Sequence, residues 1–499
     1  MCNNISNLKT HRFFKNTKYP LAVLFIALLI GTVMNFCKYG PYITPDTIGY
    51  FNMAQGKDPE LTSLSPFYSY FLSLFPFSLI SIFDRAIVSG ILMFLLAFYL
   101  LFKMSRKIGE NSVNYFFAFG ISILSWWSFR VLGSAHADSH FYFLFLFWVY
   151  LFIWKNERST LYLILICFLS ALMVWVKLNA LFLVPLLALW VIISKEKQWI
   201  YVISATIISW LIYRWNMPEN ILDLHLSNQV VLQASQLSTI GLFYENLSTW
   251  FQVNLALLFS DLLTQHIPKP LAFTSALLSF AFLIHYLVKS HNQHNNPIYK
   301  ALLISFVYSV FFLGFELKIG YKEINYRTLF PQLVTLSLAL WIYLIQYNKK
   351  KSILIIGLLI TSYTLSGHYI IWQRNDVASL ITAKRFDNSK QKETIERILN
   401  QNHQQIFSNS QEKIMLSFNT IDVLQIAPKN RFIEGKNYPL SNAETELERQ
   451  KSIQALKDGS ALVVLFQPTK EDLETYNIHG IKYLNENNMA IFYKDRLTQ

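Results

Sequence analysis

Residues 19–37 read YPLAVLFIALLIGTVMNFC and carry no charged side chain. This apolar run, Tyr19 to Cys37, matches the roughly 20 residues that an α-helix needs to cross the hydrocarbon core of a bilayer. No small-residue cleavage site follows the run, so it does not have the form of a cleavable signal peptide. The stretch therefore predicts a permanent transmembrane helix.

Comparable apolar runs recur as far as residue 371, and together they predict about eleven transmembrane helices. The expected spans are 19–37, 84–104, 112–131, 138–154, 160–176, 178–194, 198–214, 270–289, 299–316, 328–347 and 352–371. The predicted fold class is an α-helical polytopic membrane protein, with residues 1–371 as its transmembrane domain.

The composition agrees with this fold class. Of the 499 residues, 53% are hydrophobic and only 15% are charged, whereas soluble domains carry about 25% charged residues. The shortage of charge is concentrated before residue 372, and residues 372–499 are expected to form a small soluble α/β domain. That segment shows no nucleotide-binding loop, metal cluster or catalytic triad. Its expected elements are strands at 405–409, 461–466, 481–484 and 489–493 and a helix at 444–456.

The net charge of +13 does not indicate a nucleic-acid partner, because the Lys and Arg residues form short clusters between apolar runs. All these clusters fall on one side of the membrane if the N-terminus is cytoplasmic. An odd number of spans then places the C-terminal domain on the other side. The clusters are Lys9, Arg12, Lys15 and Lys18; Lys103, Arg106 and Lys107; Lys155 and Arg158; Lys195 and Lys197; and Lys349, Lys350 and Lys351.

Two long outer segments, 38–83 and 215–269, connect the predicted spans, and loops of this length are often functional. The second contains an apolar stretch at 247–263. If this stretch were a further span, it would invert everything downstream of it, so we expect an interfacial or re-entrant helix there. The three cysteines, Cys2, Cys37 and Cys167, lie outside the C-terminal domain and indicate no disulfide framework.

Asp46 is the first candidate for chemistry. It lies in the sequence YITPDTIGYFNMA, residues 42–54, a few residues beyond the outer end of the first span. Its carboxylate could accept the proton of an incoming hydroxyl or amine, as a general base does. Asp after Pro is also a common helix start, so an N-cap role for Asp46 stays open.

Asp138 is the second candidate. It lies in GSAHADSH, residues 133–140, together with His136 and His140. Helix capping, a second acid that orients substrate, and a metal site with either histidine all remain open for this carboxylate.

Two outer cations could hold a phosphate. Lys177 lies between the fifth and sixth spans, and Arg327 opens the tenth span in the sequence NYRTLFP, residues 325–331. Arg presents a planar fork that suits phosphate oxygens, whereas Lys177 could equally extend toward lipid headgroups. Carboxylates together with cations at the lipid boundary fit group transfer from an anionic lipid carrier.

The order of these motifs resembles the GT-C superfamily of polyprenyl-phosphate-sugar-dependent glycosyltransferases. The nearest groups are the bacterial branch with the RgtA/B/C/D-like domain, the aminoarabinose transferases and the protein O-mannosyltransferases. The stretches that carry the resemblance are PDTIGYFNMA at 45–54, SPFYSYF at 65–71, Asp138 with the aromatic run 141–147, WVKLNA at 175–180, YRTLFP at 326–331 and the first expected strand of the C-terminal domain at 405–409.

The resemblance implies an inverting hexosyl- or pentosyltransferase of the bacterial inner membrane, with a periplasmic C-terminal domain. The donor would be a polyprenyl-phosphate sugar, and the acceptor a periplasmic lipid, glycan or protein. Asp46 would be the general base and Asp138 a second catalytic acid. Substrate would be bound by Tyr50, Lys177, Tyr326, Arg327, His136 and His140.

Many members of that superfamily have Asp-Glu where this chain has Asp46-Thr47. One acid of the pair is therefore missing, no cofactor is indicated, and a divalent metal stays open. Two alternatives also stay open: an O-antigen polymerase or ligase, and a non-enzymatic transporter of lipid-linked glycans. Transporters place charged groups near the middle of the membrane. The position of the charges along the spans therefore discriminates between an enzyme and a transporter.

Overall fold

The computed structural model describes the helical part of the chain almost throughout and the C-terminal part in shorter pieces. The described residues are 18–39, 50, 53–54, 66–74, 82–108, 112–125, 137–154, 159–216, 238–256, 264, 266–319, 326–373, 413–417, 432–436, 453–454, 456–457, 461–466, 473–474, 476–477, 480–486 and 489–494. Contacts divide the chain into two compact units, one of Met1–Asn35, Ser65–Tyr68 and Val88–Ile370, the other of Phe36–Leu64, Ser69–Ile87 and Ile371–Gln499.

Seven of the described helices are long and apolar enough to cross a membrane. They are α2 (Lys18–Tyr39), α5 (Ile82–Ile108), α8 (Ala137–Trp154), α16 (Lys269–Lys289), α17 (Pro297–Ile319), α18 (Tyr326–Gln346) and α19 (Lys350–Gln373). Shorter apolar helices are α6 (Ser112–Ile123), α9 (Thr160–Val176) and the pair formed by the 3-10 helix η1 (Leu178–Phe182) and α10 (Leu183–Ser194). The prediction of a multi-pass α-helical membrane protein is confirmed.

Each expected span coincides with a described helix, although the helices differ in length from the expected ranges. The third span was expected at 112–131, but α6 is described only as far as Ile123. The seventh coincides with α11 (Trp199–Asn216), which is not among the seven long apolar helices. Because η1 precedes α10, the sixth span begins with a tighter turn than an uninterrupted α-helix would have.

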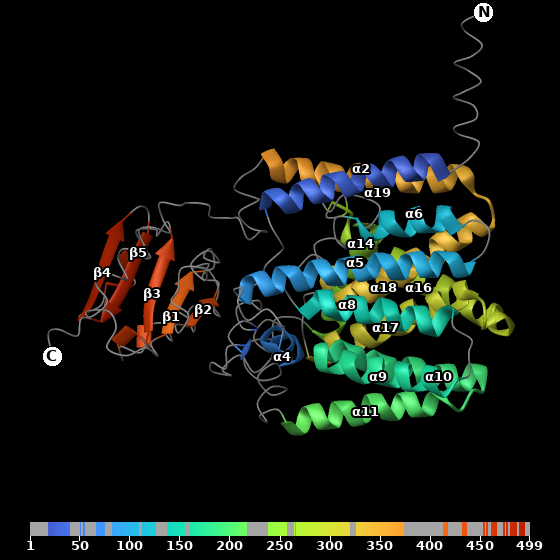
Figure 1. Ribbon diagram of the computed structural model, residues 1–499, viewed down its shortest axis with the longest axis horizontal. Helices are drawn as coiled ribbons and strands as arrows, with labels where there is room; N and C mark the ends of the chain where they lie inside the picture. Colours follow the sequence, from blue (N-terminus) through green and yellow to red (C-terminus); the bar gives the residue numbers. More distant parts are fainter. Residues whose placement is uncertain are drawn as a thin grey trace, which may run out of the picture. The chain divides into compact units, whose positions relative to one another are not determined.

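Helix α8 lies among the other helices of the bundle (Figure 1). Most of its side chains are buried. The Trp148 indole donates to Ser170 Oγ of α9 at 2.9 Å, and the Tyr142 ring lies 3.8 Å from the ring of Phe330 on α18, centroid to centroid. Helix α11 packs on the other side of α9, where the Ser209 hydroxyl donates to the carbonyl of Ala171. Most of the aromatic run that follows Asp138 is therefore part of the core, and Phe143 and Phe147 are half-buried.

Helices α2 and α19, the first and last of the long apolar helices, pack against each other through polar as well as apolar groups. Asn35 Nδ2 lies 2.8 Å from His368 Nδ1, and Gly31 lies against Leu365 so closely that a β-carbon at this position would meet that side chain at 2.7 Å. The missing side chain at Gly31 thus allows the close packing that membrane helices favour.

Helix α14 (Thr239–Ala256) is not among the helices long and apolar enough to cross a membrane. Its Trp250 indole donates to Ser309 Oγ of α17 at 3.2 Å, and its Asn254 Oδ1 accepts from Gln332 Nε2 of α18 at 2.5 Å. The apolar stretch expected at 247–263 thus begins within α14, and residues 257–263 lie outside the described part of the chain.

The second unit contains a five-stranded sheet in the order β2-β1-β3-β5-β4. Strand β1 pairs in parallel with β2 and β3, and β5 pairs antiparallel with β3 and β4. Strands β3, β4 and β5 lie where strands were expected, whereas β1 and β2 were not predicted. The expected strand at 405–409 and most of the helix at 444–456 lie outside the described residues. The bounds are β1 Lys413–Ser417, β2 Phe432–Lys436, β3 Ala461–Phe466, β4 Ile481–Glu486 and β5 Met489–Lys494.

Candidate functional site

Asp138 and Lys177 form an ion pair at one end of the helical bundle. Lys177 Nζ lies 2.5 Å from Asp138 Oδ1, with the carboxylate side chain 3% exposed and the lysine side chain 20% exposed. Burying such a pair costs free energy unless both charges are well satisfied. The pair is therefore a candidate functional site. We refer to this end of the bundle as the Asp138 end.

The hairpin of α8 and α9 explains why these two residues meet. The helices run antiparallel and are joined through residues 155–159, so the first turn of α8 and the last turn of α9 lie at the same end. Asp138 is in the first turn of α8, and Lys177 is the C-cap of α9 in an extended conformation. The helix dipoles favour a negative charge at the first position and a positive charge at the second. Asp138 lies in the first turn of α8, so the interpretation that it stabilises the start of this helix stays open beside a role in the site.

Aromatic and polar groups from three elements, α8, η1 and α17, lie around the pair. Lys177 Nζ lies 6.0 Å from the ring centroid of Phe141 and 5.9 Å from that of Tyr142. The Tyr308 ring of α17 packs edge-on against the ring of Phe182 in η1 at 4.7 Å between centroids, and Glu316 is buried near the end of α17. The Asp138 end thus combines two buried carboxylates with a partly exposed cation.

His140 lies one turn from the start of α8 and is surrounded by hydroxyl groups. Its Nε2 is 2.9 Å from Ser89 Oγ of α5, and its Nδ1 is 3.2 Å from Ser139 Oγ. The ring of Tyr68, from α4 (Pro66–Leu74), lies 4.9 Å from the imidazole centroid, and burial raises the pKa of the Tyr68 hydroxyl. Because serine hydroxyls occupy both imidazole nitrogens, these contacts describe a packed interior histidine, and substrate binding by His140 stays a prediction.

The remaining predicted residues are placed only in part. Tyr326 and Arg327 form the start of α18, where their backbone is helical. Tyr50 is buried, and its carbonyl accepts a hydrogen bond from Ser69 Oγ at 2.9 Å. Asp46 and His136 lie outside the described residues. The structure therefore brings together Asp138 and Lys177 among the predicted residues.

Sequence reasoning did not single out Glu316 or Tyr308. Glu316 is 2% exposed near the end of α17, and an acid inside an otherwise apolar run was a signal that could have identified it. Tyr308 is one of many tyrosines in apolar runs, and nothing in its sequence neighbourhood distinguishes it.

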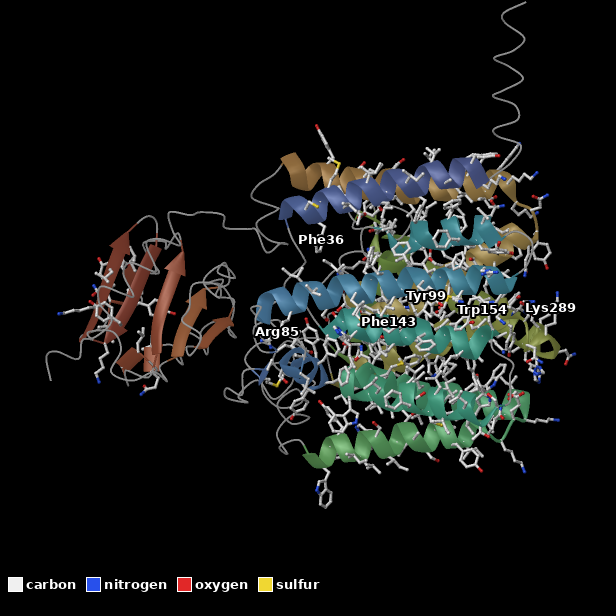
Figure 2. All side chains as sticks on the ribbon, viewed as in Figure 1. Phe36, Arg85, Tyr99, Phe143, Trp154 and Lys289 are labelled. Carbon is white, nitrogen blue, oxygen red and sulfur yellow. The ribbon has the colours of Figure 1, made fainter. Side chains whose placement is uncertain are left out.

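The charged residues of the seven long apolar helices lie close to helix ends throughout the described part of the chain. In Figure 2, Trp154 and Lys289, at the ends of α8 and α16, lie at the same end of the bundle, opposite to the Asp138 end of α8. The middle of these helices carries no Asp, Glu, Lys or Arg.

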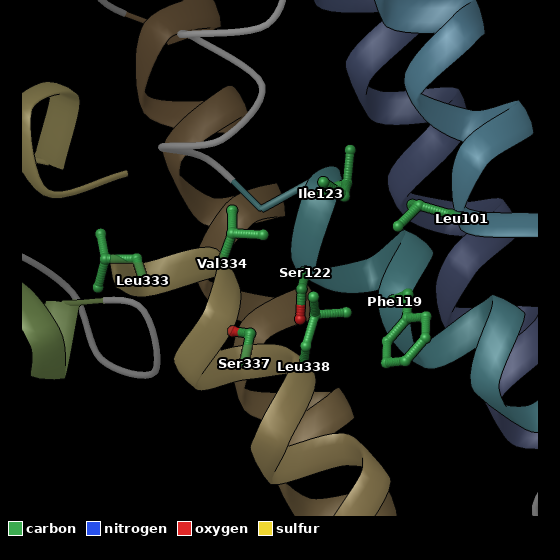
Figure 3. Close-up of a pocket in the computed structure, with 8 residues that line it drawn as sticks. All are labelled: Leu101, Phe119, Ser122, Ile123, Leu333, Val334, Ser337 and Leu338. Atoms are coloured by element: carbon green, nitrogen blue, oxygen red, sulfur yellow. The ribbon is translucent and has the colours of Figure 1, made fainter. Parts of the chain in front are cut away.

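A small cavity between α5, α6 and α18 is a different kind of feature (Figure 3). It has a volume of about 20 Å³, which is room for about one water molecule. Its two polar lining residues are Ser122 and Ser337, and Ser122 Oγ already accepts a hydrogen bond from the Trp341 indole at 2.7 Å. The other lining residues are Leu101, Phe119, Ile123, Leu333, Val334 and Leu338. A cavity so small and apolar cannot hold a sugar.

No family model matches the chain, and no curated protein matches its sequence significantly. The chemistry of the candidate site is therefore argued from its own geometry. A carboxylate that holds an ammonium group at the end of a membrane bundle can position that cation for an anionic ligand.

Proposed function

We propose that this chain is a membrane glycosyltransferase of the bacterial inner membrane. It would move a sugar from a polyprenyl-phosphate donor to a lipid, glycan or protein on the periplasmic side. The observation that supports this proposal best is the Asp138–Lys177 pair, with a buried carboxylate and a partly exposed ammonium group, at the end of the bundle that basic-residue clusters predict to be the outer one.

In the proposed reaction, a hydroxyl or amine of the acceptor attacks the anomeric carbon while Asp46 takes its proton. The bond from that carbon to the phosphate oxygen breaks, and the configuration at the carbon inverts. The leaving polyprenyl phosphate keeps the electron pair of the broken bond. Lys177 and Arg327 would stabilise the negative charge on this phosphate, since preorganised cations act most strongly where charge develops. Asp138 would hold Lys177 in place.

The position of the charges favours an enzyme over a transporter. Substrate sites in secondary transporters lie near the middle of the bilayer, whereas the long apolar helices described here keep their charged residues near their ends. An O-antigen polymerase or ligase is favoured less, because the acid-bearing segment here follows the first span and a sheet-containing segment follows the last one.

The proposal is tested in membranes that contain the wild-type protein, Asp46→Asn or Asp138→Asn at equal protein levels. Radiolabelled polyprenyl-phosphate sugars are supplied, and label in endogenous acceptors is measured. We expect transfer by the wild type and its loss in both variants. Glu245→Gln is the matched control, because Glu245 also pairs with a lysine, Lys269, but in a more exposed pair between α14 and α16.

Absence of transfer from every donor would overturn the enzyme proposal and favour transport. Transfer that survives Asp46→Asn but not Asp138→Asn would keep the enzyme and move the general base to Asp138.

A further inference from the structure

We propose that Tyr308 is a positioning residue that ties the first turn of α18, which carries Tyr326 and Arg327, to the Asp138–Lys177 pair. Its consequence for catalysis rests on the proposed function, whereas the tie itself does not. Tyr308 was not among the residues that the sequence singled out.

The first half of the tie is a hydrogen bond to α18. Tyr308 is 1% exposed, and its hydroxyl donates to the carbonyl of Thr328 at 2.5 Å. Thr328 directly follows Arg327, so this bond anchors the backbone next to the predicted phosphate-binding residue.

The first turn of α18 needs such an anchor because of Pro331. Proline has no N–H group, so Pro331 cannot donate the helical hydrogen bond that the carbonyl of Arg327 would otherwise accept. This turn of α18 therefore has one helical hydrogen bond fewer, and the Tyr308 hydroxyl adds a bond from another helix at the adjacent carbonyl, that of Thr328.

The second half of the tie reaches η1, the 3-10 helix that begins directly after Lys177. The Tyr308 ring packs edge-on against the ring of Phe182, in η1, at 4.7 Å between centroids. Tyr308 therefore contacts both the segment that follows Lys177 and the turn that carries Arg327.

A neighbouring contact joins the same two regions. Tyr142, one turn after Asp138 in α8, packs its ring against Phe330 of α18. Two aromatic contacts, one made by Tyr308 and one by Tyr142, thus connect the neighbourhood of Lys177 with the start of α18. Of these two residues, Tyr308 also makes a hydrogen bond to the α18 backbone. Because Tyr308 acts on the backbone of α18, its effect on sugar transfer passes through Arg327.

The test compares Tyr308→Phe with Tyr162→Phe. Both variants keep an aromatic ring and remove a buried hydroxyl that donates to a backbone carbonyl, but Tyr162 bonds to Leu151 at the opposite end of α8. Hydrogen–deuterium exchange of the full-length protein in lipid nanodiscs is measured for peptides covering residues 326–332. We expect faster exchange there in Tyr308→Phe and no change in Tyr162→Phe. Unchanged exchange in Tyr308→Phe would overturn the tie, whether or not the protein transfers sugar.

The catalytic consequence is tested by a double-mutant cycle with Arg327→Ala. Tyr308→Phe alone is expected to lower kcat/KM for the donor by about tenfold. In the Arg327→Ala background, the same substitution should cause no further loss, because its effect passes through Arg327. Equal losses in the two backgrounds would overturn the positioning role. A wild-type protein without any transfer would instead refute the proposed function, and the exchange measurement would still decide the tie.

Discussion

Two lysines lie at opposite ends of α8, and they are held in different ways. Lys177 at the Asp138 end pairs with a carboxylate. Lys300, in the first turns of α17, donates to the carbonyl of Phe152 at 3.2 Å and lies over the rings of Phe152 and Trp190, 5.6 Å and 5.2 Å from their centroids. The partners that stabilise the lysine therefore differ between the two ends of the bundle.

This difference in partners and exposure assigns Lys177 to the candidate site and Lys300 to a structural contact. Lys300 is 4% exposed and bonds to a carbonyl in the last turn of α8, where the helix dipole favours a cation. The side chain of Lys177 is 20% exposed and is held by a full negative charge. A ligand can reach Lys177, whereas Lys300 fastens the ends of two helices together. Predictions about the two ends therefore differ in kind.

The largest expected effect is on transfer at the Asp138 end. Asp138→Asn should lower the rate of sugar transfer roughly 10²- to 10³-fold, which is about 3–4 kcal/mol, because Lys177 loses the charge that orients it. Initial rates in membranes at equal protein level measure this effect. Glu245→Gln, in the more exposed pair, serves as control and should transfer at the wild-type rate. A rate for Asp138→Asn within about threefold of wild type, less than about 1 kcal/mol, would show that the pair is structural only.

The next effect concerns stability at the same end. Asp138→Asn leaves Lys177 without its carboxylate and should lower the free energy of unfolding by about 3 kcal/mol. The double variant Asp138→Asn/Lys177→Met removes both charges and should recover most of this loss while remaining inactive. Denaturant unfolding in detergent micelles measures both. If the double variant is as unstable as the single one, coupling between the two charges is absent.

A smaller effect is expected at the other end. Lys300→Met keeps the length and much of the packing of the side chain but removes the hydrogen bond to Phe152 and the cation–ring contacts. We expect a loss of about 1–3 kcal/mol in stability and unchanged sugar transfer. The same unfolding and transfer measurements apply. A loss of transfer at full stability would contradict the purely structural assignment of Lys300.

The smallest effect is expected for Tyr162→Phe, which removes one hydrogen bond between α9 and the carbonyl of Leu151. The expected cost is about 1 kcal/mol of stability. Transfer and the donor KM should match the wild type in steady-state assays. Any change in KM would mean that the far end of α8 influences the Asp138 end.

Much of the fold could be predicted because its signals are local. A run such as Tyr19 to Cys37 specifies a membrane helix by itself, since every backbone polar group in lipid must be satisfied within the segment. Strands β4 and β5 were predictable from equally local signals, and they pair as an antiparallel hairpin because they are neighbours in the sequence. Strands β1 and β2 were not predicted. Their parallel pairing joins segments that are not neighbours along the chain.

The sequence identified Asp138 and Lys177 as individual candidates, but it did not predict that they contact each other. Asp138 and Lys177 each stood out as a charge at the edge of an apolar run, and their type and position were enough for that. Nothing in the sequence joined them, because the contact depends on how two antiparallel helices align along their length. Tyr308 was invisible for a related reason, since its importance comes from the carbonyl that its hydroxyl reaches on another helix.

The sequence by itself determined that this is a multi-pass helical membrane protein, because hydrophobic length is a local property that the bilayer selects directly. Tertiary structure alone decided that Asp138 meets Lys177, 39 positions away, and that Tyr308 connects their neighbourhood to the turn after Arg327. These contacts follow from side-chain packing between helices, which no single segment encodes.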